Sequence, residues 1–503
     1  MEQNLDVFNE NIIKWYEFSN TNKIMQLGKN ENITRYLEKI FEEVIVVEKV
    51  ENININEEKF DYILIYGVEG YYDSIEKVSK FLKEDGKVLL IGRNPFGINN
   101  WGKYSIEEKD GVRKLENYYK HNCDISKIKE KIINSNLAKT NIYYAFPDYS
   151  QTELVINEKF NIQKSILEKY KPILKDDEIK VFDEIKVLKN IVENNSEMLE
   201  FFANSYFIEA SKKEIDTDIR FVSYNNCRNE KYRLITLIRD NVVQKIPVND
   251  FAKEHIKQMG ETINDIKDCG IDVLDYEENG IIYSKLIKNE KTLDEVLGEN
   301  YNNLNYVVEI LNNIKEILLR NSVKYSENKE NIDSKGQDDK LLENLNFMKK
   351  AFWDMIPKNC FYINNKFIFF DQEWKKEYLP VEFIIYRSVI NSYDLVRKIN
   401  VDELLEKLNI LQYKEYFEKL DEDIRNEIIN EKIYKEMYCK EIKAVDNLIN
   451  ENIMYKEYIQ KLENEVIKDL QEDNRKKQEY IDLLEEKNRI NEEKIKKIFF
   501  WKR

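Results

Sequence analysis

The sequence predicts an α/β domain with a parallel, doubly wound sheet, then an α+β domain and an α-helical tail. Short apolar runs alternate with helical stretches between residues 23 and 145. Strand candidates gather around one helix between 200 and 300, and the chain after about 400 has helical composition. A chain of 503 residues also exceeds what one hydrophobic core usually organises. We therefore expect a first domain at 1–145, a connector at 146–200, a second domain at 201–430 and a tail at 431–503.

Composition excludes several classes of protein. Hydrophobic residues make up 42% and charged residues 35%, which allows real cores beneath a charged surface. The net charge of -16 argues against a nucleic-acid partner, because phosphate binding needs clustered Lys and Arg. Five scattered cysteines without a CxxC pair predict reduced thiols. The acidic, polar start and the lack of a long apolar run predict a cytoplasmic protein.

The first domain contains two residues suited to binding a nucleotide-like cofactor. Strand candidates KIMQL, VIVVEK, FDYILIY and KVLLIG alternate with helix candidates ITRYLEKIF and SIEKVSKFLKE. Gly28 follows the first strand, where a glycine lets the backbone approach a cofactor. Glu48 ends the second strand, where an acid can bind ribose hydroxyls.

These positions, with NPFGINNW after the fourth strand, resemble class I S-adenosylmethionine-dependent methyltransferases. The resemblance implies a Rossmann-like fold with Gly28 and Glu48 as cofactor-binding residues. The loop keeps only one glycine, and bulky residues 29–32 would crowd the methionine part of the cofactor. We therefore expect a degenerate domain, with S-adenosylmethionine a doubtful cofactor; a working methyltransferase is the alternative.

The second domain has the elements of an antiparallel sheet interrupted by a helix. Strand candidates are RFVSY, YRLITLIRD, NVVQKIPV, DVLDYEE and GIIYSKLI. The helix NDFAKEHIKQMGETINDI is opened by a cap at Asn249 or Asp250.

The segment FWDMIPKNCFYINNKFIFFDQEW carries three polar residues at a defined spacing. Asp354 is followed five positions later by Asn359, and Asp371 comes after two strand-like runs, CFYI and KFIFF. Asn364 and Asn365 suit a tight hairpin turn between those runs. Pairing the strands would place Asn359 and Asp371 side by side, as oxygen ligands of a hard cation.

This spacing resembles protein kinases and related phosphotransferases. The resemblance implies a protein-kinase-like fold, with Asp354 as catalytic base and Asn359 and Asp371 as magnesium ligands. The alternative is structural: Asp354 and Asn359 cap a turn, and Asp371 ends an edge strand.

The same resemblance assigns further residues. Lys245 in VVQKIPV would grip the phosphates of ATP, and Glu254 on the following helix would be its ion-pair partner. Glu373 would be an auxiliary metal ligand. The sequence departs from kinases in lacking a glycine in NNCRNEK and in having Phe352 where a histidine is usual, which also permits a pseudokinase.

The tail has an apolar stripe and a basic end. Ile459, Leu462, Val466 and Leu470 follow steps of three and four residues, which predicts a coiled coil that makes a homo-oligomer. A solvated single helix is the alternative. The end KIKKIFFWKR favours peripheral contact with the inner face of an anionic membrane, or a buried end of the coil.

The whole layout resembles bacterial bifunctional methyltransferase and kinase proteins of O-antigen and surface-glycan assembly. It implies a kinase-like phosphotransferase that uses ATP and Mg²⁺ on a glycan or small-molecule hydroxyl. Two alternatives stay open: a non-catalytic assembly protein, and an active S-adenosylmethionine-dependent methyltransferase.

Overall fold

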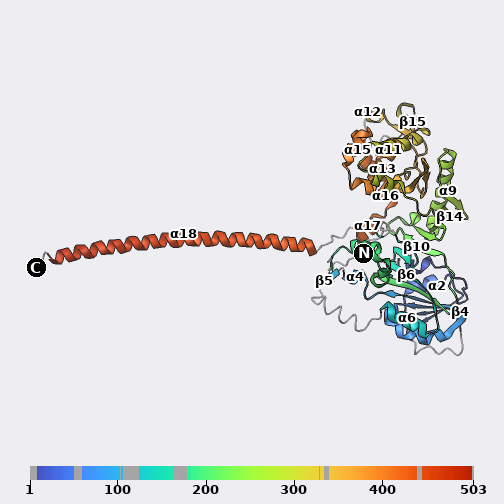
Figure 1. Ribbon diagram of the computed structural model, residues 1–503, viewed down its shortest axis with the longest axis horizontal. Helices are drawn as coiled ribbons and strands as arrows, with labels where there is room; N and C mark the ends of the chain where they lie inside the picture. The colour runs from blue at the N-terminus through green and yellow to red at the C-terminus, as the bar shows by residue number, and fades with distance from the viewer. Residues whose placement is uncertain are drawn as a thin grey trace.

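One large sheet runs through both predicted domains (Figure 1). The computed structural model describes residues 8–49, 59–101, 103–105, 124–162, 167, 178–180, 182–327, 329–332, 339–438 and 445–500. Its 12-stranded sheet has the order β13-β14-β12-β11-β10-β7-β6-β9-β4-β3-β1-β2.

The first part of this sheet is Rossmann-like. Its strands are β1 (Lys23–Leu27), β2 (Glu43–Val47), β3 (Phe60–Tyr66), β4 (Leu82–Arg93), β6 (Lys139–Phe146) and β9 (Ser205–Ser211). Strands β2, β1, β3 and β4 are parallel, and β9 lies antiparallel between β4 and β6. A parallel series with one antiparallel strand inserted is the strand arrangement of a methyltransferase-like fold. Strand β3 is buried along nearly its whole length, because helices cover both faces of the sheet.

The helices of this part form two layers. One core cluster includes residues of α3 (Ile75–Val78), α6 (Ile125–Asn134), α7 (Glu184–Asn195) and α8 (Leu199–Phe202). The other includes residues of α1 (Asn11–Lys14) and α2 (Glu31–Leu37). Short elements complete the part: α4 (Ile98–Trp101), β5 (Lys103–Ser105) and β8 (Glu178–Lys180).

The stretch expected to be a connector contributes a strand to the sheet. Strand β7 (Leu154–Asn157) pairs with β6 on one side and with β10 (Ile219–Tyr224) on the other. The backbone groups of the two predicted domains are therefore hydrogen-bonded into one sheet.

Beyond β10 the sheet is antiparallel. It continues through β11 (Leu234–Arg239), β12 (Val242–Pro247), β14 (Ile281–Lys285) and β13 (Tyr276–Glu278). Helix α9 (Lys253–Asp268) buries an apolar face against these strands, with Asn249 capping the short turn before it.

A helical part follows and has its own core. Its longer helices are α10 (Leu293–Glu299), α11 (Leu304–Leu319), α13 (Val381–Ile390), α15 (Val401–Lys407), α16 (Lys414–Ile428) and α17 (Glu431–Tyr438). Shorter elements are α12 (Asp339–Leu342), α14 (Tyr393–Val396), and a small sheet of β15 (Ser322–Lys324), β16 (Asn346–Met348) and β19 (Leu379–Pro380). The hairpin of β17 (Cys360–Ile363) and β18 (Lys366–Phe369) forms as predicted. Asn364 and Asn365 have φ of 51° and 61°, as a type I′ turn requires.

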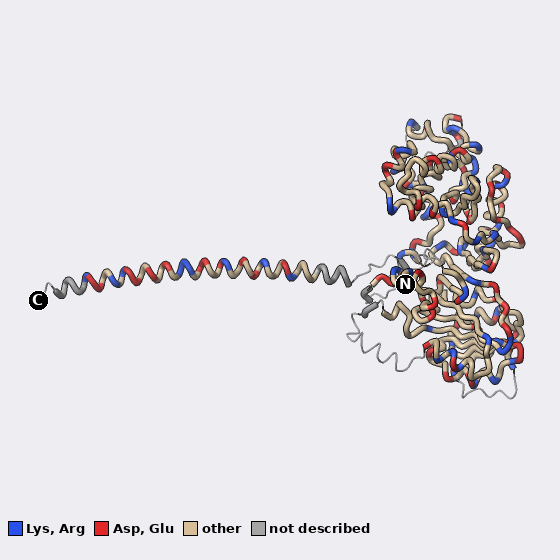
Figure 2. Tube along the Cα trace, in the orientation of Figure 1, with Lys and Arg blue, Asp and Glu red and all other residues tan. Residues whose placement is uncertain are grey.

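The tail is one long helix, α18 (Val445–Phe500), of 56 residues (Figure 1). Its residues from 452 to 494 are exposed, and both signs of charge alternate along it (Figure 2). The side chains of 495–500 and all of 501–503 lie outside the described residues, and with them the predicted basic membrane contact. Among the helices described, none combines the length and the apolar character that crossing a bilayer requires.

Candidate functional site

The carboxyl ends of β1, β3, β4 and β6 meet at one edge of the sheet. There they bring together Gly28, Glu69, Arg93, Asp148 and Tyr149, which we call the sheet-edge site. The chain leaves β1 for β2 on one side and returns to β3 on the other, so the strand order reverses between β1 and β3. Open α/β sheets bind ligands outside the carboxyl ends of their strands at such a point.

Gly28 and Glu48 lie together at this edge. Gly28 has φ +86°, and a Cβ there would lie 2.2 Å from the carbonyl oxygen of Tyr66, so only glycine fits. Its N–H donates to the carbonyl of Val47 at 3.3 Å. Glu48 comes directly after Val47 and is exposed.

The residues after Gly28 begin helix α2. The Asn30 side chain accepts hydrogen bonds from two backbone N–H groups at the start of the helix, and its amide donates to the hydroxyl of Tyr66 at 3.3 Å. Lys29 and Glu31 are exposed. The predicted crowding of the cofactor by residues 29–32 stays a prediction.

Glu69 is the titratable group at the centre of the site. One carboxylate oxygen accepts from the backbone N–H of Arg93 at 3.1 Å, and the other from the hydroxyl of Tyr149 at 3.4 Å. Burial raises the pKa of the Glu69 carboxyl, and the backbone hydrogen bonds only partly offset it. Burial of the Tyr149 phenol raises its pKa, and the nearby negative charge of Glu69 raises it further.

Sequence reasoning missed this cluster. Arg93 at the end of β4 pairs with Asp148, in the loop after β6, at 3.4 Å, although the two residues lie far apart in sequence. The sequence offered one indication of this cluster, since Glu69 and Arg93 each come soon after an apolar strand candidate.

The second domain contains a cavity of about 440 Å³, which we call the second-domain cleft. Asp354, Asn359, Asp371, Glu373 and Arg228 are among the residues that line it. The structure thus brings together the three residues singled out by spacing and the predicted auxiliary ligand. Their catalytic and metal-binding roles stay predictions.

Lys245 has different partners from those expected. On β12 it forms ion pairs with both Asp371 and Glu373. Glu254 is exposed on α9, so the predicted pair with Lys245 is wrong. The buried face of that helix includes the next residue, not Glu254. His255 occupies that face, with Nε2 3.8 Å from a Glu373 oxygen.

Glu373 is the centre of the charge network in the cleft. A guanidinium nitrogen of Arg228 donates to it at 2.5 Å, in addition to Lys245. Burial opposes ionisation of the Glu373 carboxyl, but Arg228 and Lys245 hold its pKa well below the usual range. The side chain proposed as an auxiliary metal ligand is thus already paired with cations. Within the described residues, no three His, Cys, Asp or Glu side chains are arranged to hold a metal ion.

Asp354 and Asn359 are connected through the backbone. The Asn359 amide donates to the carbonyl of Asp354 at 3.2 Å, and Gln372 donates to the same carbonyl at 3.1 Å. Burial raises the pKa of the Asp354 carboxyl, and Arg387, 3.7 Å away, opposes this rise.

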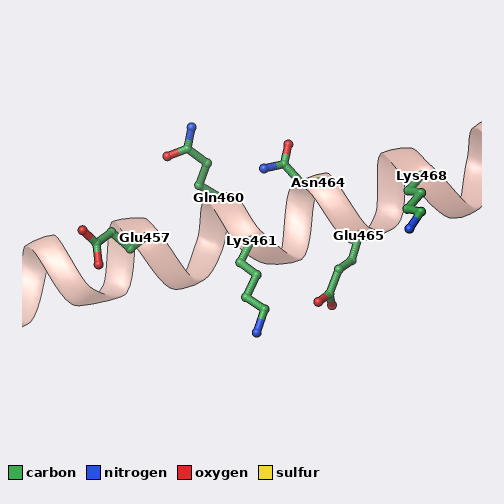
Figure 3. A pocket seen from close by; sticks show the side chains of 6 residues that line it. All are labelled: Glu457, Gln460, Lys461, Asn464, Glu465 and Lys468. Atoms are coloured by element: carbon green, nitrogen blue, oxygen red, sulfur yellow. The ribbon is translucent and has the colours of Figure 1, made fainter.

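A second hollow lies on α18. All six side chains that line it belong to one stretch of that helix, and they point away from it in several directions (Figure 3). No second element among the described residues forms an opposite wall, so this hollow is a surface feature of a lone helix.

The matches to known proteins are all structural. No protein-family model and no curated protein matches the sequence. A possible histamine N-methyltransferase from Thermotoga maritima is 10% identical, with a TM-score of 0.23, over 41% of this chain and 89% of its own. A methyltransferase from Archaeoglobus fulgidus is 13% identical, with a TM-score of 0.24, and the match covers 41% of this chain and 94% of its own. Phosphoethanolamine N-methyltransferase 2 of Haemonchus contortus, in complex with S-adenosyl-L-methionine, is 12% identical, with a TM-score of 0.25, over 41% and 52%.

These comparisons correct the cofactor prediction of ATP and Mg²⁺ with S-adenosylmethionine doubtful. The similar structures are S-adenosylmethionine-dependent enzymes, some of them with S-adenosylmethionine or S-adenosylhomocysteine bound. The strand order and the position of Gly28 agree with a methyltransferase-like fold for the first domain. The matches cover 41 to 42% of the chain, so the protein-kinase-like fold of the second domain stays a prediction.

Proposed function

We propose that the chain is an S-adenosylmethionine-dependent methyltransferase whose reaction takes place at the sheet-edge site. The observation that carries the proposal is that Gly28 and Glu48 lie at the point where the strand order reverses, with the partly buried Glu69 at the same edge of the sheet. A glycine that lets the backbone approach, an acid beside it and a perturbed carboxyl are the parts that such a reaction needs.

The residues at this edge fit the cofactor. Gly28 provides a loop with no side chain at its tightest point, and Glu48 is exposed, so that its carboxylate could accept hydrogen bonds from the ribose hydroxyls. When bound, S-adenosylmethionine supplies an electrophilic methyl group. The chain must then hold the acceptor and remove its proton.

Glu69 is the residue we assign to proton removal. Its raised pKa makes the ionised carboxylate a better base than an exposed glutamate, and Tyr149 and Arg93 fix its orientation. The acceptor we propose is a hydroxyl of a glycan or small molecule, in keeping with the surface-glycan proteins that the sequence resembles. Glu69 would take the hydroxyl proton while the acceptor oxygen takes the methyl group of the cofactor, whose bond to sulfur breaks to leave S-adenosylhomocysteine.

For the second domain we propose a non-catalytic role. Arg228, one of the cations that line the cleft, is paired with Glu373, and Lys245 is paired with both Asp371 and Glu373. An anionic ligand that took Arg228 would have to break its pair with the buried Glu373, which is costly. The domain then serves as a scaffold for the methyltransferase-like part.

Thermal unfolding of the full chain with added ligands tests the function. A ligand that binds only the folded state stabilises it by about 2.7 kcal/mol at a hundred times its Kd. We expect S-adenosylhomocysteine to raise the melting temperature and ATP with Mg²⁺ to leave it unchanged. A rise with ATP and none with S-adenosylhomocysteine would refute the proposal.

A further inference from the structure

The loop between β10 and β11, residues 225–233, contacts the second-domain cleft and Thr152, which lies just after Asp148 and Tyr149 of the sheet-edge site. Arg228 in this loop donates to Glu373 at 2.5 Å on the cleft side. Asn226, two residues earlier, donates to the carbonyl of Thr152 at 3.3 Å on the other side. Both Asn226 and Thr152 are buried, so water does not readily replace this hydrogen bond.

Thr152 holds the segment that carries two residues of the sheet-edge site. Its hydroxyl donates to the carbonyl oxygens of Asp148 at 3.1 Å and Tyr149 at 3.3 Å. Tyr149 in turn donates to Glu69. Hydrogen bonds through Tyr149, Thr152 and Asn226, with the backbone from Asn226 to Arg228, thus connect the Glu69 carboxylate to the Glu373 carboxylate.

The loop is also held from a third direction. The chain leaving α16 runs beside it: the N–H of Asn229 donates to the carbonyl of Ile428, and the N–H of Asn430 donates to Cys227, both at 2.8 Å. The Asn229 side chain donates to the carbonyl of Glu427 at 3.1 Å. These contacts fix the middle of the loop, so Arg228 and Asn226 belong to one rigid unit.

We propose that loop 225–233 couples the two sites, so that releasing Arg228 from Glu373 loosens the Asp148–Thr152 segment. An anionic group in the cleft that competes for Arg228 would have this effect, and a ligand at the sheet edge would, by linkage, tighten the Arg228–Glu373 pair. The consequence for methyl transfer rests on the proposed function; the coupling itself does not.

Amide hydrogen exchange on the full chain tests the coupling without any ligand. In Arg228→Gln, amides of residues 148–152 should exchange about tenfold faster or more, because a charge-assisted hydrogen bond is lost. Arg220→Gln is the matched control: Arg220 lies on β10 and pairs with Asp240 at the surface, so residues 148–152 should not change. If Arg228→Gln fails to fold, the same exchange measurement is made on Arg228→Lys. That variant keeps the positive charge but loses the guanidinium group.

A second variant decides between coupling and general loosening. In an Asn226→Ala background, Arg228→Gln should still speed exchange near Glu373 but add nothing at residues 148–152, because the connection is cut. Faster exchange confined to 226–230 and the cleft, or an undiminished effect at 148–152 in the Asn226→Ala background, would overturn the proposal. Titration with S-adenosylhomocysteine is run separately, so a chain that does not bind it refutes the proposed function and leaves the exchange result to judge the coupling.

Discussion

The carboxylates of the partly buried Glu69 and the buried Glu373 have surroundings that shift their pKa values in opposite directions. Glu69 accepts hydrogen bonds from a backbone N–H and a phenol, so the cost of burial prevails and its pKa rises. Glu373 faces Lys245 and Arg228, whose charges outweigh the same cost. The first therefore suits proton transfer and the second suits a fixed structural charge.

The pKa of Glu69 predicts a pH-dependent stability. A carboxyl whose pKa is raised on folding stabilises the protein below its unfolded pKa and loses that contribution as pH rises through the folded value. The side chain in the Glu69→Gln variant does not titrate, so the variant does not lose this contribution. Its free energy of unfolding relative to that of wild type should therefore rise between about pH 4 and about pH 8. Urea unfolding at both values measures this, with the exposed Glu84→Gln as control. A difference that does not change with pH would show that Glu69 titrates normally.

Glu373→Gln should destabilise the protein, because it leaves Lys245 and Arg228 without their shared buried partner. The expected loss is about 3 kcal/mol in the free energy of unfolding at neutral pH. Its pKa is lowered on folding, so the loss should shrink as pH falls through the unfolded value. Glu254→Gln, exposed on α9, should change stability by less than about 0.5 kcal/mol. Equal effects of the two substitutions would contradict the network described.

Elements with local signals were predictable from the sequence, and those set by distant pairing were not. The β17–β18 hairpin followed from two asparagines between apolar runs, and its closure brought Asn359 near Asp371. Strands β7 and β9 were missed, because their partners lie far along the chain. The predicted ion-pair partner Glu254 lies one residue before His255, which is on the buried face of α9.

Helix α18 carries an apolar stripe with no cover among the described residues. Ile459, Leu462, Val466 and Leu470 are 42 to 58% exposed, although their spacing suits a helix partner. Asn474, Asn488 and Asn491 interrupt this stripe farther along the helix, as a solvated single helix would allow.

We propose that α18 forms a coiled coil with other copies of the chain. Leu462→Asp should convert an oligomer to a monomer in sedimentation velocity, because a charge in the seam disfavours pairing. Gln460→Asp adds the same charge two positions away and should keep the oligomer. The fold of the rest of the chain should be unaffected, since Leu462 lies on an exposed helix. A wild-type monomer would remove this proposal.

At the scale of the whole molecule, the β7–β10 pairing makes the first and second domains share a sheet. Domain boundaries drawn from composition could not reveal this, because a strand at 154–157 lies inside a stretch that looks like a connector. The same pairing places loop 225–233 between the two sites.

A shared sheet predicts cooperative unfolding. Calorimetry of the full chain should show one main transition for the two domains, because separating them would expose the edges of β7 and β10. Val222→Pro, in the middle of β10, should lower stability by about 3 kcal/mol or more, because it removes a ladder hydrogen bond. Two resolved transitions in the wild type would contradict a shared unit.

The proposed function requires that the carboxyl edge of the sheet bind S-adenosylmethionine through Gly28 and Glu48. Isothermal titration of S-adenosylhomocysteine into the full chain measures this binding. Wild type should bind one molecule. Glu48→Gln should bind about tenfold more weakly, because an acceptor for ribose hydroxyls loses its charge. Glu43→Gln, at the opposite end of the same strand, should bind as wild type does. No binding to wild type, or equal weakening by Glu43→Gln and Glu48→Gln, would contradict the account.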